Sequence, residues 1–274
     1  MPAPMHAPTT APYLICATPR SGSTLLCDLL TATGVAGHPE EYFQLLPITG
    51  RARHPREYLA PVWEGEIAAI LGERSPVDDE PTQLEQRGAA TFDEYLERIR
   101  AIATTPNGVF GAKVMWGYFP GLIWHLDATA DATDRDAAAV LDAAFPGVRY
   151  LHVTRRDKER QAMSLWRALQ TWTWRADQQP PSDRPVVFCR RAIQHLAASL
   201  EADDAAWRAW FAATGVELVG TVVYEDLAAE PDAGLGAVLD ALGLPLPERH
   251  RAAPSLSRQA DATTEAWQQQ LLDR

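Results

Sequence analysis

Apolar residues along the chain follow two patterns, short unbroken runs and longer stretches with helical spacing. Four short runs predict strands over residues 13–17, 108–115, 148–154 and 216–223. Helical spacing predicts helices over residues 24–33, 92–104, 157–174, 190–213 and 233–242, and a shorter helix over 64–71. Strands that alternate with helices are typical of a parallel sheet covered by helices, so we expect an α/β fold.

The remaining segments predict loops around a single domain, and no internal repeat is present. Residues 1–12 are rich in Pro and Ala and lack a basic region followed by an apolar stretch, so we interpret them as a flexible tail and not a signal peptide. Residues 39–86 contain many prolines and charged residues, which predicts a long irregular segment around an active site. Residues 127–136 and 178–184 predict surface loops. Neither loop is long enough to mark a boundary, so we assign residues 13–274 to one domain.

The turn after the first predicted strand has the composition of an anion-binding loop. Thr18-Pro-Arg-Ser-Gly22 ends the strand, and Ser23 and Thr24 begin a helix. The free amides of this turn and of the first helical turn point at one spot, where the helix dipole is also positive. Ser21, Ser23 and Thr24 add hydroxyl donors, and Arg20 adds a charge that can bind two oxygens. The pattern predicts a phosphate or sulfate ester as ligand, and its alternative is a Ser-capped helix that binds nothing.

Two other kinds of phosphate-binding loop do not match this turn. A nucleotide triphosphatase loop needs two spaced glycines followed by Lys and then Ser or Thr, whereas this turn has one Gly and no Lys. A dinucleotide-binding loop needs three spaced glycines, which are also absent. The turn therefore predicts a different class of anion site.

A second basic turn follows the predicted strand 148–154. Arg155 comes directly after that strand, and Ser164 lies about 2.5 helical turns further along the next helix. Ligands of open parallel sheets sit at the carboxyl ends of the strands, so Arg155 is expected at the same edge as Arg20. The alternative is a solvated charge run, which we expect for Lys158. Two basic turns at one edge predict a ligand with two separate anionic groups.

Composition argues against a nucleic-acid-binding protein and against a membrane-spanning protein. The chain has 274 residues, of which 46% are hydrophobic, and a net charge of -11. That charge argues against a nucleic-acid surface, so an anion site must be a local basic pocket. No run approaches the ~20 apolar residues of a membrane span. The three cysteines lack metal spacing, and we expect Cys16 and Cys27 in the core, which fits a reducing cytoplasm.

Six sequence blocks resemble the sulfotransferases that use 3′-phosphoadenosine-5′-phosphosulfate, and more narrowly the bacterial trehalose 2-sulfotransferase family. The blocks are Tyr13 to Leu26, Thr33-Gly-Val-Ala-Gly37, Pro39-Glu-Glu-Tyr-Phe-Gln44, Thr105 to Trp116, Gln161 to Gln170 and Arg258-Gln-Ala-Asp261. Their order and spacing run through nearly the whole chain, and Tyr224-Glu-Asp-Leu227 resembles a segment common among sulfotransferases at large. The resemblance implies a P-loop-like sulfotransferase fold and a carbohydrate or glycolipid acceptor such as trehalose.

The same resemblance implies roles for individual residues. The loop from Arg20 to Thr24 would hold the 5′-phosphosulfate, and Arg155 with Ser164 would hold the 3′-phosphate. Glu41 would act as the general base, and Arg20 would balance the charge on the leaving phosphate. The product would be adenosine 3′,5′-bisphosphate, and no metal is expected because a sulfate monoester carries little charge. The family forms homodimers with the acceptor site near the partner subunit, so a homodimer is expected here.

Several candidates keep alternative interpretations. The candidate acceptor contacts are His38, Glu40, Gln44, Lys113 and Trp116. Glu40 and Glu41 are also consistent with two solvated carboxylates in a loop, with Glu40 as the second choice of base. Lys113 is either an edge-strand lysine or a cation near the site. His38 stands where the trehalose enzymes carry Glu, and a surface histidine is the favoured interpretation. Arg258 either closes over the 3′-phosphate or is a surface arginine of a late loop.

Two other functional classes remain open at this point. A magnesium-dependent kinase could use a related strand, loop and helix, although the missing loop lysine argues against it. A non-catalytic protein would bind adenosine 3′,5′-bisphosphate and transfer nothing. A carboxylate at Glu41 favours the enzyme over this second alternative.

Overall fold

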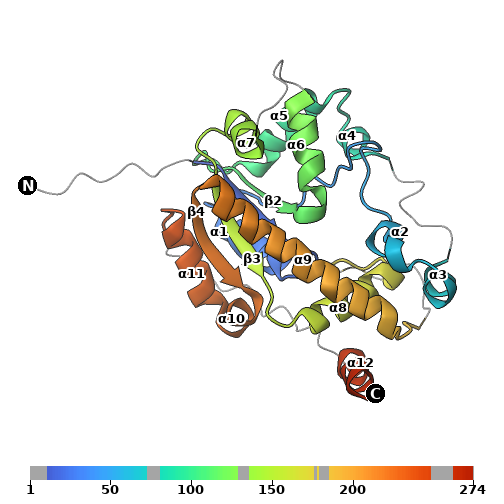
Figure 1. The fold of residues 1–274 in the computed structure, drawn as a ribbon. Helices are drawn as coiled ribbons and strands as arrows, with labels where there is room; N and C mark the ends of the chain where they lie inside the picture. The colour runs from blue at the N-terminus through green and yellow to red at the C-terminus, as the bar shows by residue number, and fades with distance from the viewer. Residues whose placement is uncertain are drawn as a thin grey trace, which may run out of the picture.

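A parallel sheet lies at the centre of the fold (Figure 1). The computed structural model describes residues 11–72, 81–128, 136–175, 178, 185–247 and 262–273. Within these residues the strands are β1 (Tyr13–Ala17), β2 (Gly111–Met115), β3 (Arg149–Thr154) and β4 (Leu218–Val223), in the order β2-β1-β3-β4. Each neighbouring pair is parallel, which confirms the predicted α/β fold and its four predicted strands.

Helices cover both faces of this sheet. One face carries α1 (Ser23–Thr33), α10 (Tyr224–Ala229) and α11 (Pro231–Ala241). The other face carries α5 (Phe92–Ala103), α6 (Phe119–Ala128), α7 (Ala137–Ala144) and α9 (Arg190–Thr214). A third group packs around α8 (Lys158–Thr171) and includes α3 (Gly65–Leu71) and α12 (Ala262–Leu272). The shorter elements are α2 (Pro55–Tyr58), η1 (Ala60–Val62), α4 (Gln83–Gln86) and η3 (Trp116–Tyr118).

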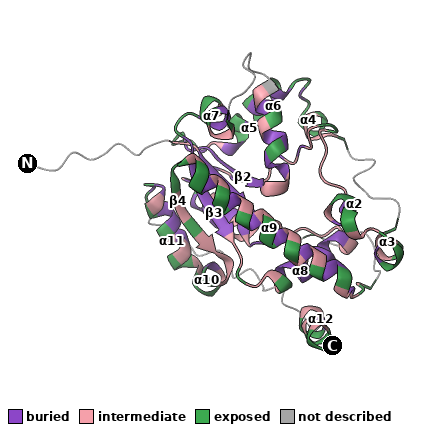
Figure 2. Cartoon of the chain, viewed as in Figure 1, coloured by how far each residue is buried: buried purple, intermediate pink, exposed green. Residues whose placement is uncertain are grey.

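The first strand explains why its sequence is an unbroken apolar run. Leu14 and Cys16 pack into the core shared with α5, α6, α7 and α9. Tyr13, Ile15 and Ala17 pack into the opposite core shared with α1 and α11. Figure 2 shows the buried strands β2 and β3 between the helices, whereas the edge strand β4 is only partly buried. A strand covered on both faces needs apolar side chains at every position, so period-two alternation is absent.

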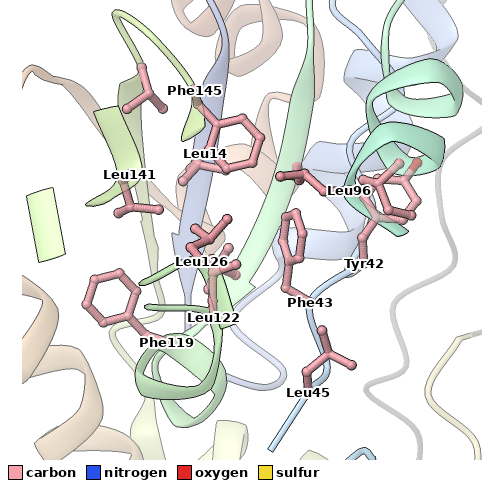
Figure 3. Close-up of a cluster of buried hydrophobic side chains, with 14 of the residues drawn as sticks. Leu14, Tyr42, Phe43, Leu45, Leu96, Phe119, Leu122, Leu126, Leu141 and Phe145 are labelled. Atoms are coloured by element: carbon pink, nitrogen blue, oxygen red, sulfur yellow. The ribbon is translucent and has the colours of Figure 1, made fainter. Parts of the chain in front are cut away.

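The segment between α1 and α2 is anchored in the core by three buried side chains. Tyr42, Phe43 and Leu45 are all buried in the cluster that contains Leu122 and Leu126 of α6 (Figure 3). Burial of such side chains contributes about 1.5–3 kcal/mol each. The residues that immediately precede Tyr42 are therefore held in place although they belong to no helix or strand.

Six α-helices of the described residues were not predicted: α2, α4, α6, α7, α10 and α12. Pro120 lies in the first turn of α6, where proline is tolerated because the amide it lacks has no helical partner. The carboxylate of Asp136 caps α7 by accepting from the amides of Ala138 and Ala139 at 2.6 and 3.2 Å. The prediction of a surface loop over 127–136 is wrong at its start, because α6 continues to Ala128.

The three cysteine thiols are free and buried, which confirms the core positions predicted for Cys16 and Cys27. Burial raises the pKa of the Cys16 thiol well above its ordinary value. Burial also raises the pKa of Cys27 to about 12, with Lys113 acting in the opposite direction.

A buried polar cluster lies between β3 and α9. Asp204, which is 1% exposed, accepts from His152 Nε2 at 3.1 Å and lies 3.5 Å from Lys158 Nζ. The expected core position of His152 is confirmed, whereas the expectation of a solvated Lys158 is wrong, because its ammonium binds this inward carboxylate and the hydroxyl of Thr154. Burial raises the pKa of Asp204, but the hydrogen bond from His152 and the charge of Lys158 outweigh it and lower the pKa to about 2.

We predict that Asp204→Asn lowers the free energy of unfolding at pH 7 by about 2 kcal/mol, because the depressed pKa measures the stabilisation of the carboxylate. That stabilisation is complete above the unfolded-state pKa of about 4 and is lost as the pH falls toward about 2. Urea unfolding of parent and variant between pH 7 and pH 2 would measure it. Asp240→Asn, an exposed position on α11, is the control and should change little. A gap between parent and Asp204→Asn that stays constant down to pH 2 would contradict the assignment.

Candidate functional site

The turn that follows β1 has an unusual backbone at two positions. Arg20 has φ of 61° and Gly22 has φ of 88°, and the amide of Ser21 donates to the carbonyl of Thr18 at 3.3 Å. A Cβ on Gly22 would lie 2.3 Å from Cδ2 of Tyr224, so both its conformation and its surroundings require glycine. This compact turn leads directly into α1 and has the strand, loop and helix geometry predicted for an anion cradle.

The side chain of Arg20 is held by α8 and by the non-helical segment that follows this helix. Its Nε donates to Oγ of Ser164 on α8 at 2.9 Å, and its Nη1 donates to the carbonyl of Trp174. Burial, followed by the positive charges of Arg155 and Arg167, lowers the pKa of Arg20 to about 10. Like charges gathered in a partly dry site are stabilised by a bound anion.

Arg155 lies beside Arg20, as the strand order requires. Its Nη1 lies 3.4 Å from the carbonyl oxygen of Arg20, and its guanidinium covers the ring of Tyr224 at 4.6 Å from the ring centroid. The prediction that the two arginines share one edge of the sheet is confirmed by this contact. Ser164, which was expected to act with Arg155, instead binds the side chain of Arg20.

Two polar atoms at this edge are buried and lack a hydrogen-bond partner among the described residues. They are Oγ of Ser21 and Nε of Arg155. The nearest carboxylate oxygen of Glu225 is 4.0 Å from that Nε, which is beyond hydrogen-bond distance. Buried donors without a partner are costly, and an anion with several oxygens would satisfy both of them.

Glu225 fixes the second basic turn through its backbone. Its carboxylate accepts from the amides of Arg156 at 3.1 Å and Asp157 at 3.2 Å, directly before α8. Burial raises the pKa of Glu225, but these two backbone hydrogen bonds outweigh it and the net pKa is lowered. Tyr224 and Glu225 are site residues that the residue pattern did not indicate, and only the block Tyr224-Glu-Asp-Leu227 drew attention to them.

A second charged pair lies beside the loop. Lys113 on β2 is 6% exposed, and its Nζ lies 3.2 Å from Oε2 of Glu41 and 3.3 Å from Oγ1 of Thr24. Burial lowers the pKa of Lys113, but the adjacent Glu41 carboxylate outweighs it and the net pKa is raised. Lys113 lies on an edge strand and its ammonium also lies beside the loop, so both interpretations of its position hold and its role in the site stays a prediction.

The backbone on either side of Glu41 explains why this carboxylate is fixed. The amide of Lys113 donates to the carbonyl of Glu40 at 2.9 Å, and the hydroxyl of Tyr95 donates to the carbonyl of Tyr42. Phe43 is buried in the core beyond them. Glu40 is exposed, whereas the Glu41 side chain is only 16% exposed. The two adjacent carboxylates therefore have different environments.

Two tyrosines near Glu41 were not singled out from the sequence. The hydroxyl of Tyr118 accepts from the amide of Arg53 at 2.7 Å, and Tyr58 lies under the guanidinium of Arg53 at 4.3 Å. Burial raises the pKa of Tyr58 to about 12, with the charge of Glu41 contributing in the same direction. Both phenols are therefore protonated at neutral pH and able to donate hydrogen bonds.

The remaining candidates have mixed placements. His38 is half-buried, and its amide donates to the carbonyl of Ala103 at 3.0 Å. Gln44 is also half-buried. Trp116 stacks on Phe119 at 5.5 Å between ring centroids, which places it in an aromatic cluster of the core. Arg258 lies outside the described residues.

Among the described residues there are neither membrane-spanning helices nor groups of metal-binding side chains. None of the helices in the described ranges combines the length and the apolar character needed to cross a membrane. Across the same ranges, no three His, Cys, Asp or Glu side chains are grouped so that they could hold a metal ion.

The sequence matches a known protein family and curated relatives. The family described as Stf0 sulphotransferase matches residues 12–272. A trehalose 2-sulfotransferase of Mycobacterium tuberculosis is 38% identical over 257 residues, which cover 93% of this chain and 92% of that protein. A trehalose 2-sulfotransferase of Mycolicibacterium smegmatis is 37% identical over 259 residues, with the same two coverages. Among solved structures, a sulfotransferase domain from the curacin biosynthetic pathway has a TM-score of 0.45 and 17% identity, over 87% of this chain and 75% of that chain.

We predict that Gly22→Ala destabilises the protein more than Gly34→Ala. Both glycines have a positive φ, so both substitutions cost about 1–2 kcal/mol for the left-handed conformation. Only the Cβ at Gly22 meets a neighbour, the ring of Tyr224, whereas nothing lies within 4 Å of the Cβ at Gly34. Urea unfolding would compare the two variants, and equal losses would show that the packing against Tyr224 is not tight.

Proposed function

The chain belongs to the Stf0 sulphotransferase family, and from this premise we propose that it transfers a sulfuryl group from 3′-phosphoadenosine-5′-phosphosulfate to a hydroxyl of a trehalose-like carbohydrate or glycolipid. One observation carries the proposal. The Lys113 ammonium contacts both Glu41 and Thr24, which lies in the first turn of α1 directly after the turn that follows β1. A carboxylate able to accept a proton therefore lies beside the place where an anion would bind. Group transfer to an alcohol needs these two functions side by side.

The residues at the ends of β1 and β3 fit a donor with two anionic groups. The loop from Arg20 to Thr24 would hold the phosphosulfate, and Arg155 would hold the 3′-phosphate. Support comes from the unpartnered buried donors of Ser21 and Arg155 and from the like charges that lower the pKa of Arg20. The donor supplies the sulfuryl group when it is bound. The protein supplies positive charge that balances the negative charge growing on the leaving phosphate.

Glu41 is the proposed general base. The Lys113 ammonium lies 3.2 Å from Oε2 of Glu41 and holds the carboxylate in a fixed place, from which it could accept the proton of an acceptor hydroxyl. Lys113 also contacts Oγ1 of Thr24, so one cation orients the carboxylate and lies close to the bound anion. Transfer of the proton to Glu41 would raise the nucleophilicity of the hydroxyl as its bond to sulfur forms.

The acceptor is proposed from the relatives and from the polar groups around Glu41. The two curated relatives are trehalose 2-sulfotransferases. In this chain burial raises the pKa of Tyr58 and Tyr118, and both lie close enough to Glu41 for its charge to raise the pKa further. Polar groups near the carboxylate suit a polyhydroxylated acceptor. A metal-free reaction, a cytoplasmic location and a homodimer remain predictions, and sedimentation velocity of the purified protein would test the last of them.

We predict transfer of labelled sulfate from 3′-phosphoadenosine-5′-phosphosulfate to trehalose by the purified protein, followed by chromatography of the sugar. A panel of other polar alcohols run in parallel would locate the acceptor class if trehalose is not the substrate. Adenosine triphosphate with magnesium is the matched control for a kinase and should give no labelled product. Binding of adenosine 3′,5′-bisphosphate without transfer to any acceptor would contradict the proposal and favour a binding protein.

We predict that Glu41→Gln lowers kcat by ~10²–10⁴-fold, because the amide cannot accept the proton. The affinity for the donor should stay near that of the parent. Glu40→Gln is the matched control, since the neighbouring carboxylate is exposed, and it should keep parental turnover. Glu41→Asp keeps a carboxylate but shortens the side chain, so it tests whether the position of that carboxylate matters for turnover. Parental turnover by Glu41→Gln would remove Glu41 from this role.

A further inference from the structure

Gln161, on the first turn of α8, contacts the turn from Thr18 to Gly22 (the anion loop). It is completely buried, and its Nε2 donates to Oγ1 of Thr18 at 2.9 Å and to the carbonyl of Pro19 at 2.7 Å. These two residues directly precede Arg20. Both amide hydrogens of one side chain are therefore used to hold the first half of the loop.

The orientation of this amide is set by a charge. Oε1 of Gln161 lies 3.4 Å from Nζ of Lys158, and an ammonium group can only donate. The amide oxygen must therefore face Lys158, and the NH₂ group must face the loop. Lys158 is in turn held by Asp204 at 3.5 Å, so the orientation rests on the buried cluster between β3 and α9.

The loop needs such support because of its backbone. Arg20 adopts a left-handed conformation that a residue with a side chain rarely adopts, and such conformations persist only where the surroundings over-determine them. Trp207 of α9 holds the adjacent carbonyl of Ala17 through its Nε1 at 2.9 Å. Gln161 and Trp207 thus bind three consecutive residues, from Ala17 to Pro19, immediately before the strained position.

We propose that Gln161 is a positioning residue, which keeps the loop from Thr18 to Gly22 in the shape that binds the anionic donor. The inference rests on the proposed function, because it assigns the donor to this loop. Gln161 acts through the Pro19 carbonyl and the Thr18 hydroxyl and touches neither the donor nor the acceptor. Glutamate at this position would have nearly the same shape but would offer no hydrogen to the Pro19 carbonyl.

The test compares Gln161→Met with Gln170→Met. Gln170 lies on the same helix, and its Nε2 donates to the carbonyl of Val187 at 3.1 Å, away from the loop. Both substitutions remove one amide of similar size from α8. Binding of adenosine 3′,5′-bisphosphate is measured by calorimetry, and the KM values for donor and acceptor are measured separately.

We expect Gln161→Met to weaken bisphosphate binding and raise the donor KM by about tenfold. Its acceptor KM and its kcat at saturating donor should stay within about twofold of the parent, as should all constants of Gln170→Met. If Gln161→Met does not fold, Thr18→Val removes one acceptor of the same amide and should weaken the bisphosphate in the same direction. Unchanged bisphosphate affinity in the folded variant, or equal effects of the two glutamine substitutions, would overturn the proposal.

The two hypotheses fail in different ways. A parent protein that binds the bisphosphate but sulfates no acceptor would overturn the proposed function, while the ratio of affinities between parent and Gln161→Met would still test the positioning role. A parent that does not bind the bisphosphate at all would overturn both.

Discussion

The parallel pairing of β1 with β3 is the constraint on which the site depends. Ala17 pairs with Val153, so the two strands end side by side and their following turns meet. Arg20 and Arg155 are far apart in the sequence, yet they are brought into contact because each lies just beyond one of these ends. The two neighbouring positive charges repel each other, and the packing of the sheet on both faces offsets this unfavourable energy. A β3 shifted by one residue would turn its inward side chains to the wrong face and separate the turns.

Polar side chains near the carboxyl ends of the strands fix the segments that surround the two arginine turns. Glu225 holds the start of α8, Gln161 holds the start of the anion loop, and Lys113 links β2 to Glu41. Glu225 and Gln161 come from helices that follow strand ends, and Lys113 comes from strand β2 itself. The loops at the edge are therefore short segments clamped by rigid neighbours, which is the arrangement that pre-organised sites require.

The sequence allowed the sheet and the cradle to be predicted because their signals are local. The run over 13–17 is apolar at every position, and the turn after it concentrates Arg20, Ser21 and Gly22. The partners of these residues could not be predicted, because they come from distant elements. Ser164 was assigned to Arg155 from its position along the helix, but in three dimensions its hydroxyl meets Arg20. Lys158 looked solvated within a charged run, although a carboxylate on α9 draws it inward.

The burial of all three cysteines has a practical consequence. Only the thiolate reacts readily with maleimides or oxidants, and burial raises the pKa of Cys16, Cys27 and Cys189 alike. We therefore expect the native thiols to react slowly with thiol reagents at neutral pH. A single cysteine introduced at an exposed position away from the candidate site, such as Asp240, would be the preferred point of attachment for a fluorophore, and no native cysteine would have to be removed first.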